Sequence, residues 1–210
     1  MKVISFDLDG TLFKKGLDDE FWLRLIPEAI AEQRSISIEE AKEYVIKEYD
    51  AIGSDDIRWY MPEYWLERFN INTRVEYMLN RLEYSSALYD DVYALKELSR
   101  YRIVIATCNP EVMAKRKVEL LREKDIKIES VFSSISYGIL KSSEFYMHVV
   151  TSLGVDAKSI LHIGDNLHQD FIIPSSIGMN ALLIDREDKA YDQYKEYTIV
   201  SLYDLLRFLN

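Results

Sequence analysis

Two aspartates, Asp7 and Asp9, stand one residue apart at the end of the apolar segment KVISFD. In a strand, the side chains of residues i and i+2 point to the same face, so these two like charges would crowd each other. Carboxylates held this close are costly unless a cation or a proton relieves their repulsion. The pair therefore indicates that a cation or a proton is held beside it.

Short apolar segments rich in β-branched residues predict the strands that would position this pair. Four of them read as buried parallel strands, and a fifth as a further short strand: residues 2–7, 102–107, 159–165, 181–185 and 128–134. Helical patterns separate the later strands and follow the last one, at residues 90–100, 110–124, 142–154 and 201–209. This alternation predicts an α/β fold with a Rossmann-like parallel sheet.

About 70 residues intervene between the first strand and the resumed alternation, far more than an ordinary loop needs. Their pattern is helical, and two capping boxes, Ser37 with Glu40 and Thr73 with Glu76, each predict the start of a helix. Gly53 is expected to end the helix that begins after Ser37. We therefore predict a helical bundle at residues 14–87, inserted into an α/β core made of residues 1–13 and 88–210.

The carboxyl ends of the other predicted strands also bear polar residues. In open parallel sheets, ligands bind beyond these ends, so the polar residues should meet at one edge. They are Thr107, Cys108 and Asn109 after the second strand, Asp165 and Asp170 after a later one, and Lys141 before a helix. Each residue alone would be an ordinary turn, cap or surface residue. Together their oxygens suit a hard cation, which is expected to be Mg²⁺.

The motifs DLDGT at 7–11, Thr107 in IVIAT, Lys141 in YGILK and GDNLHQD at 164–170 occur in this order. With them the chain resembles the haloacid dehalogenase-like hydrolase superfamily, in its phosphatase type. The resemblance covers residues 1–13 and those from about 88 to the end. By position and character, the inserted bundle resembles the helical cap of that superfamily.

This resemblance implies roles for the carboxylates. Asp7 would attack phosphorus as the nucleophile and form an aspartyl-phosphate. Asp9 would protonate the leaving oxygen and then activate water. The Asp7 side chain, the Asp9 backbone carbonyl and Asp165 would hold Mg²⁺.

The resemblance also implies supporting roles. Thr107 and nearby backbone amides would hold phosphoryl oxygens, while Lys141 would offset negative charge. Asp170 would support the metal site rather than bind the ion. Gly10 and Thr11 would lead the chain away from the site and into the inserted bundle.

The sequence departs from the superfamily pattern after Thr107. Cys108 stands where many relatives have asparagine, and Asn109 follows one residue late. Backbone amides of Cys108 and Asn109 could still bind phosphate, but the role of the Asn109 side chain stays open. His168 lies inside the last motif, and whether it reaches the site also stays open.

Composition narrows the classes of partner. The chain carries 36 acidic and 26 basic residues, a net charge of −10, which disfavours nucleic acid and anionic membranes as partners. Its single cysteine excludes an internal disulfide. Neither a signal peptide nor an apolar span of membrane length is visible, so we expect a cytoplasmic protein.

The leading functional hypothesis is a Mg²⁺-dependent phosphatase acting on a small phosphorylated metabolite, with the cap excluding water and selecting the substrate. A phosphomutase acting on a sugar phosphate would use the same Asp7 and Asp9. A haloacid dehalogenase is disfavoured, because relatives with that activity lack the second aspartate of the first motif. A non-catalytic binding module is the remaining alternative. Neither the native substrate nor the oligomeric state can be read from the sequence.

Overall fold

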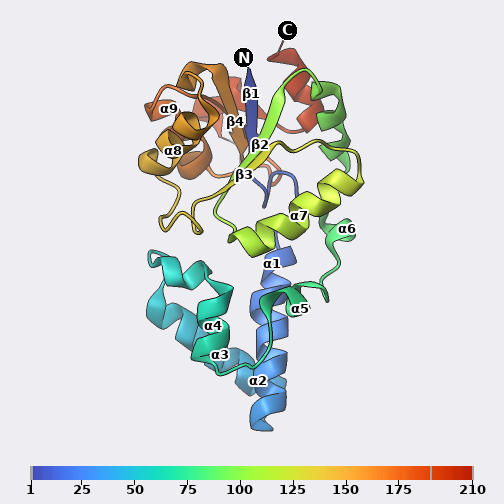
Figure 1. Cartoon of the computed structure of the whole chain (residues 1–210), viewed down its shortest axis with the longest axis vertical. Helices are drawn as coiled ribbons and strands as arrows, with labels where there is room; N and C mark the ends of the chain where they lie inside the picture. Colours follow the sequence, from blue (N-terminus) through green and yellow to red (C-terminus); the bar gives the residue numbers. More distant parts are fainter. Residues whose placement is uncertain (1, 190, 210) are drawn as a thin grey trace. The chain divides into compact units, whose positions relative to one another are not determined.

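Six parallel strands form one sheet in the order β3-β2-β1-β4-β5-β6 (Figure 1). Their bounds are Val3–Phe6 for β1, Arg102–Thr107 for β2, Ser130–Ser133 for β3, Ile160–Gly164 for β4, Asn180–Ile184 for β5 and Thr198–Ile199 for β6. The central strands β1, β2 and β4 are almost wholly buried, which explains why they read as unbroken apolar segments. The computed structural model describes residues 2–189 and 191–209.

Helices cover both faces of this sheet. Those of the α/β core are the α-helices α7 (Glu111–Glu123), α8 (Ser143–Leu153) and α9 (Ile173–Ser176), the π-helix η5 (Leu167–Ile172), and the 3₁₀ helices η3 (Asp90–Leu98), η4 (Ala157–Ser159), η6 (Asp192–Tyr197) and η7 (Leu202–Arg207). In Figure 1, α8 and α9 lie together on one side of the strands. There, Phe145 and Val149 of α8 pack against Val3 and Val104 of the sheet.

The described chain divides into two units. One comprises Lys15–Ala87, and the other comprises the residues up to Lys14 together with those from Leu88 onward. The division lies one residue from the boundary predicted between residues 13 and 14. Phe13 and Leu88 form an isolated antiparallel bridge where the chain leaves the α/β unit and returns to it.

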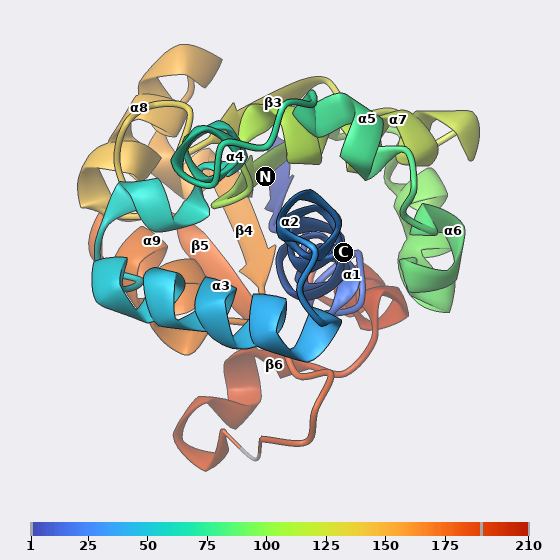
Figure 2. The same ribbon diagram turned by 90° about the horizontal axis from the view of Figure 1, so that it is seen from below.

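The inserted unit is helical throughout its regular structure. It contains α1 (Leu17–Glu20), the π-helix η1 (Phe21–Leu25), α2 (Ile26–Arg34), α3 (Ile38–Ile52), the 3₁₀ helix η2 (Ile57–Tyr60), α4 (Pro62–Arg68), α5 (Val75–Leu79) and α6 (Tyr84–Ala87). The first three are consecutive, and Pro27 lies in the first turn of α2, directly after the π-helix η1. Proline has no backbone N–H to donate, and the irregular hydrogen bonding of a π-helix can accommodate that loss. Within this unit, α2 and α3 cross at a wide angle, for Figure 2 shows α2 end-on and α3 lengthwise.

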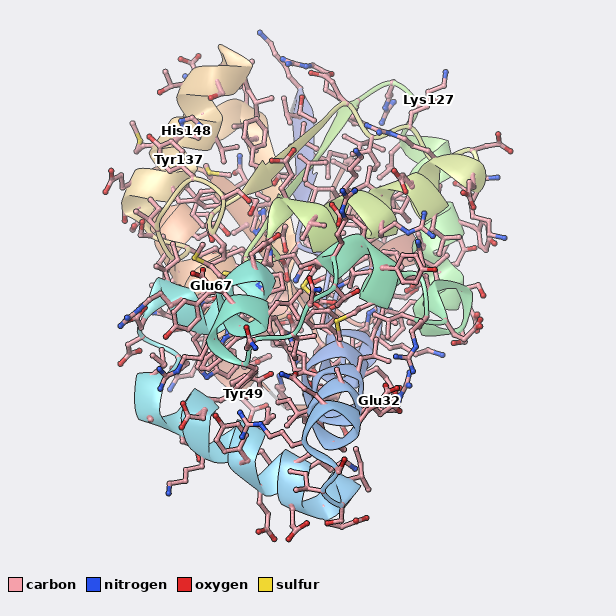
Figure 3. The ribbon with its side chains drawn as sticks, turned by 60° about the horizontal axis from the view of Figure 1, so that its bottom comes forward. Glu32, Tyr49, Glu67, Lys127, Tyr137 and His148 are labelled. Atoms are coloured by element: carbon pink, nitrogen blue, oxygen red, sulfur yellow. The ribbon has the colours of Figure 1, made fainter. Side chains whose placement is uncertain are left out.

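Aromatic side chains form the core of the inserted unit. Tyr49 of α3, labelled in Figure 3, meets Trp65 of α4 edge-to-face with the ring centroids 4.5 Å apart. Its hydroxyl donates to the Trp22 carbonyl at 3.3 Å, and Trp65 also stacks on Phe69. Burial raises the pKa of Tyr49 far above its usual range. The aromatic residues concentrated in this segment therefore serve largely to pack its helices.

The predicted α/β fold with a parallel sheet is confirmed, and most predicted elements are present. The Ser37 capping box forms, and Gly53 ends α3 as predicted. The predicted capping box at Thr73 is wrong, because α5 begins at Val75, and its N-cap is Arg74, whose side chain makes no capping hydrogen bond. The predicted closing helix forms as the 3₁₀ helix η7. The strand β6 was not predicted, because its two residues give no strand pattern. No helix among the described residues is long and apolar enough to cross a membrane.

A largely buried ion pair joins distant parts of the α/β unit. The Arg186 guanidinium donates to both Asp91 carboxylate oxygens, at 2.6 and 2.9 Å, and to the Thr11 carbonyl at 2.8 Å. The Asp91 carboxylate also accepts from Ser201 Oγ and from the Leu202 N–H at the start of η7. Burial alone would raise the pKa of Asp91, but these donors outweigh it and lower that pKa.

We predict that Asp91→Asn lowers the free energy of unfolding at pH 7 by about 2 kcal/mol, less than for a fully buried pair because the site is partly exposed. A carboxyl with a depressed pKa in the folded state stabilises above its unfolded pKa and loses that contribution as pH falls through its folded pKa. The difference between wild type and variant should therefore shrink below about pH 4. Urea unfolding across pH 3–7 measures this difference in the free energy of unfolding, and Asp90→Asn, at an exposed neighbouring residue, is the control. A difference that does not change with pH would contradict the role of the Asp91 carboxylate.

Candidate active site

The register of the sheet brings the polar strand ends to one edge. Phe6 of β1 pairs with Ile105 of β2 and with Ile163 of β4. Asp7, Thr107 and Asp165 come one or two residues after these three paired residues. They therefore lie at the same edge of the sheet, on three adjacent strands. All three are buried.

Lys141 lies at the centre of this edge, almost entirely buried, as its side chain is 2% exposed. Its ammonium donates to Asp7 Oδ1 at 2.8 Å and to Asp170 Oδ1 at 2.6 Å. A buried ammonium is tolerable only when carboxylates compensate its lost hydration. Lys141 therefore joins two segments of the chain that are far apart in sequence.

The loop before α8 presents Lys141 and is itself fastened at three points. Ser142 caps α8, its hydroxyl accepting from the Phe145 N–H. Ser136 Oγ accepts from the Glu111 N–H at the start of α7. The Tyr137 ring stacks on His148 of α8, with the centroids 4.0 Å apart (Figure 3). These contacts restrict where the Lys141 side chain can point.

Asp170 is held by several donors besides Lys141. Its Oδ1 lies 3.2 Å from His162 Nε2 and 3.3 Å from the Tyr146 hydroxyl, while its Oδ2 accepts from the Asn166 N–H at 3.0 Å. His162 Nδ1 in turn lies 2.9 Å from Ser5 Oγ. His162 of β4 thus belongs to a buried polar network, which also contains Tyr146, a residue that sequence reasoning missed.

The pKa values of this network follow from burial and charge. Burial raises the pKa of Asp7, helped by Asp170 and Asp9 and opposed by Lys141. Burial alone would also raise the pKa of Asp170, but Lys141 and His162 outweigh it and lower that pKa well below its usual range. Burial alone would lower the pKa of Lys141, yet Asp170 and Asp7 raise it well above its usual range. Burial lowers the pKa of His162.

The carboxylates also form an oxygen-rich cluster. Oxygens of Asp7, Asp165 and Asp170 lie within 4.8 Å of one another. Because both Asp170 oxygens already accept hydrogen bonds, Asp7 and Asp165 are the better side-chain ligands for a hard cation. A Cβ on Gly10 would lie 2.5 Å from the Asp165 carboxyl carbon, so glycine lets Asp165 approach the backbone beside Asp9. The donor set therefore fits Mg²⁺.

Asp9 is held by two side chains of the second βα unit. Asn109 Nδ2 donates to Asp9 Oδ2 at 2.6 Å, and Lys117 Nζ donates to Asp9 Oδ1. Sequence reasoning left the role of the Asn109 side chain open and missed Lys117, which lies in the basic run KRK of α7. A signal was present: Lys117 falls at helical spacing between Met113, Ala114 and Leu121, all of which are buried.

Thr107, at the end of β2, is hydrogen-bonded to the backbone around it. Thr107 Oγ1 accepts from the Asn109 N–H at 3.2 Å, and the Thr107 carbonyl accepts from the Ser134 N–H. The Cys108 thiol lies 3.7 Å from both Ser134 Oγ and Gln169 Oε1, and burial raises its pKa. Because its pKa is raised, the Cys108 thiol is protonated at neutral pH and is not a nucleophile.

The remaining predicted residues lie around this cluster. Thr11 is buried, and its carbonyl accepts from Arg186. His168 is exposed on η5, where its N–H donates to Asn166 Oδ1. Asp165 lies near Lys189, with 3.9 Å between its Oδ2 and Nζ, and its carbonyl accepts from the Tyr191 hydroxyl. Lys189 was not foreseen, because it follows β5 in a segment without a motif.

Comparison with known proteins assigns this arrangement to a family. A family model described as haloacid dehalogenase-like hydrolase matches residues 1–172. The chain belongs to this family. Among curated proteins, GMP/IMP nucleotidase YrfG of Escherichia coli is 26% identical over 169 residues, covering 78% of this chain and 73% of that protein.

Solved structures share the fold of this haloacid dehalogenase-like hydrolase. A HAD phosphatase from Thermococcus onnurineus superposes with a TM-score of 0.83 at 24% identity, over 100% of this chain and 98% of that one. A magnesium-bound structure of YfnB from Bacillus subtilis superposes with a TM-score of 0.65 at 18% identity, over 100% and 98%. The fold prediction made from the four motifs is thus confirmed.

We predict that Gly10→Ala destabilises the protein more than Gly138→Ala. Both glycines have positive φ, so each substitution costs about 1–2 kcal/mol in backbone strain. Only at Gly10 does the new Cβ also collide with the Asp165 carboxyl, whereas nothing lies within 4 Å of a Cβ at Gly138. Denaturant unfolding should show a loss larger by at least ~1 kcal/mol for Gly10→Ala. Equal losses would contradict the close approach of Asp165.

Proposed function

We propose that this hydrolase is a Mg²⁺-dependent phosphatase that hydrolyses a small phosphate monoester through an aspartyl-phosphate on Asp7, with Lys15–Ala87 as its cap. The observation that supports this most is the placement of Asp7. Its carboxylate is buried at the end of β1 and accepts from Lys141. Carboxylates in this position serve as nucleophiles when neighbouring charge holds them in place and the attacked group is electrophilic.

In the first step, a carboxylate oxygen of Asp7 forms a bond to phosphorus as the bond from phosphorus to the leaving oxygen breaks. Asp9 gives its proton to that leaving oxygen. In the second step, Asp9 takes a proton from water, whose oxygen attacks phosphorus while the bond to Asp7 breaks. Inorganic phosphate leaves, and Asp7 and Asp9 return to their initial states.

The metal ion would be held by the Asp7 and Asp165 carboxylates and by the Asp9 backbone carbonyl. When bound, it supplies positive charge that withdraws electrons from phosphorus through the phosphoryl oxygens. Two features support these ligands: the oxygen-only cluster of carboxylates, and the hydrogen bonds that already occupy Asp170. Asp170 would then keep Lys141 in place rather than bind the ion.

The phosphoryl oxygens would be bound by the Thr107 hydroxyl and by N–H groups of residues 108 and 109, with Lys141 offsetting charge. Preorganised donors of this kind stabilise charge that develops in the transition state. The E. coli relative supports a phosphate monoester as substrate, since its name describes a nucleotidase acting on GMP and IMP. These two nucleotides are therefore the first members of a substrate panel.

We expect purified protein to release phosphate from p-nitrophenyl phosphate or acetyl phosphate with added Mg²⁺, and EDTA to abolish release. Asp7→Asn removes the nucleophile and should lower kcat by at least ~10⁴-fold. Asp192→Asn, at an exposed carboxylate of η6, is the matched control and should retain wild-type activity.

Undiminished turnover by Asp7→Asn would rule out the proposed nucleophile. Turnover unaffected by EDTA would rule out the metal dependence. A panel of phosphorylated metabolites that includes GMP and IMP identifies the substrate class, and formation of an isomeric phosphate instead of free phosphate would favour the phosphomutase alternative.

A further inference from the structure

Lys117 is a lysine in an unusual place. Its side chain is fully buried, at 0% exposure, on the face of α7 that also buries Met113 and Val118. Removing an ammonium from water is unfavourable unless an anion and further acceptors compensate it. The ammonium donates to Asp9 Oδ1 and, at 2.7 Å, to Asn109 Oδ1, and it lies 5.9 Å from the centre of the Phe13 ring.

These contacts close a ring of three side chains. The Asn109 amide donates through Nδ2 to one Asp9 oxygen and accepts through Oδ1 from Lys117, which donates to the other Asp9 oxygen. The amide of Asn109 is therefore fixed in one orientation, and both oxygens of Asp9 are engaged. Ser133 Oγ also donates a hydrogen bond of 2.6 Å to the backbone carbonyl of Asn109. Rotation of the Asp9 carboxylate would break two charge-assisted hydrogen bonds.

The arrangement is asymmetric in burial. Lys117 is inaccessible, whereas the Asp9 side chain is 27% exposed and so retains an open side. A pair serving stability alone gains little from this geometry, since apolar residues of similar volume often replace buried ion pairs without loss. A pair that must aim a carboxylate at a reactant needs a fixed buried partner on one side of the carboxylate and an open side that the reactant can approach.

We propose that Lys117, acting with Asn109, is a positioning residue that holds the Asp9 carboxylate in the orientation needed for proton transfer to the leaving group. The inference rests on the proposed function, in which Asp9 is the general acid. Lys117 does not touch the reacting atoms in this account. It acts through Asp9, and loss of its ammonium frees the carboxylate to rotate toward water.

The leaving group provides a readout that a purely structural lysine would not change. An alkoxide must receive a proton as it departs, whereas p-nitrophenolate leaves without one. The value of kcat/KM reports the steps up to transfer of the phosphoryl group to Asp7, where the acid acts. Misplacing Asp9 should therefore harm an alkyl phosphate much more than p-nitrophenyl phosphate.

The test compares wild type, Lys117→Met, Asp9→Asn and the double variant, with Lys115→Met at an exposed position of the same helix as control. We expect Lys117→Met to lower kcat/KM about 10²-fold for an alkyl phosphate that the wild type hydrolyses, and less than about 10-fold for p-nitrophenyl phosphate. The double variant should lie within about 3-fold of Asp9→Asn alone, because both changes remove the same contribution. Lys115→Met should match the wild type with both substrates.

Equal losses with both substrates, or additive losses in the double variant, would overturn the positioning role while leaving the phosphatase intact. Absence of wild-type phosphatase activity would instead overturn the proposed function, and this inference with it. Should Lys117→Met not fold, as judged by circular dichroism, Lys117→Gln keeps an amide donor to Asp9 and permits the same comparison. We expect Lys117→Gln to lose less kcat/KM than Lys117→Met, again with a larger loss for the alkyl phosphate than for p-nitrophenyl phosphate.

Discussion

The buried ammonium of Lys141, between Asp7 and Asp170, is the interaction on which the rest of the site depends. Without it, two carboxylates would stand close together in a water-poor region, where their repulsion would be severe. With it, the end of β1, the loop before α8 and the helix after β4 are tied to one point. The same contact explains why Asp170 is ionised and already hydrogen-bonded, which leaves Asp7 and Asp165 as the better candidate ligands for the proposed metal ion.

The site contains a second cation of the same kind on its other side. Lys117 is as buried as Lys141 and engages the other aspartate of the first motif. Each aspartate of DLDGT therefore has its own buried lysine, one supplied before α8 and the other by α7. Each carboxylate therefore has a separate set of contacts, which suits the distinct roles proposed for the two residues. The two lysines also place positive charge inside a chain whose net charge is −10.

The sequence was most informative where residues follow strand ends. Asp7, Thr107 and Asp165 could be placed at one edge because strand direction and topology alone determine where such residues fall. Lys117 gave only a weaker signal, its place on the buried face of a helical pattern, and Tyr146 and His162 gave none. The partners of a polar residue inside an apolar pattern are set by tertiary packing. The Thr73 capping box failed for a related reason: a four-residue pattern cannot specify a helix start that the surrounding packing places at Val75.

Covalent phosphorylation of Asp7 is the step on which the proposed mechanism depends, and chemical trapping can detect it. The wild type is mixed with ³²P-labelled acetyl phosphate and Mg²⁺ and quenched in acid within milliseconds. It is then digested, and the labelled peptide is sequenced. We expect label on the peptide that contains Asp7, and we expect hydroxylamine to remove it, as it does from an acyl phosphate. Label on a residue other than Asp7 would contradict the proposed nucleophile. So would the absence of label from both the wild type and Asp9→Asn under conditions in which the wild type turns over rapidly.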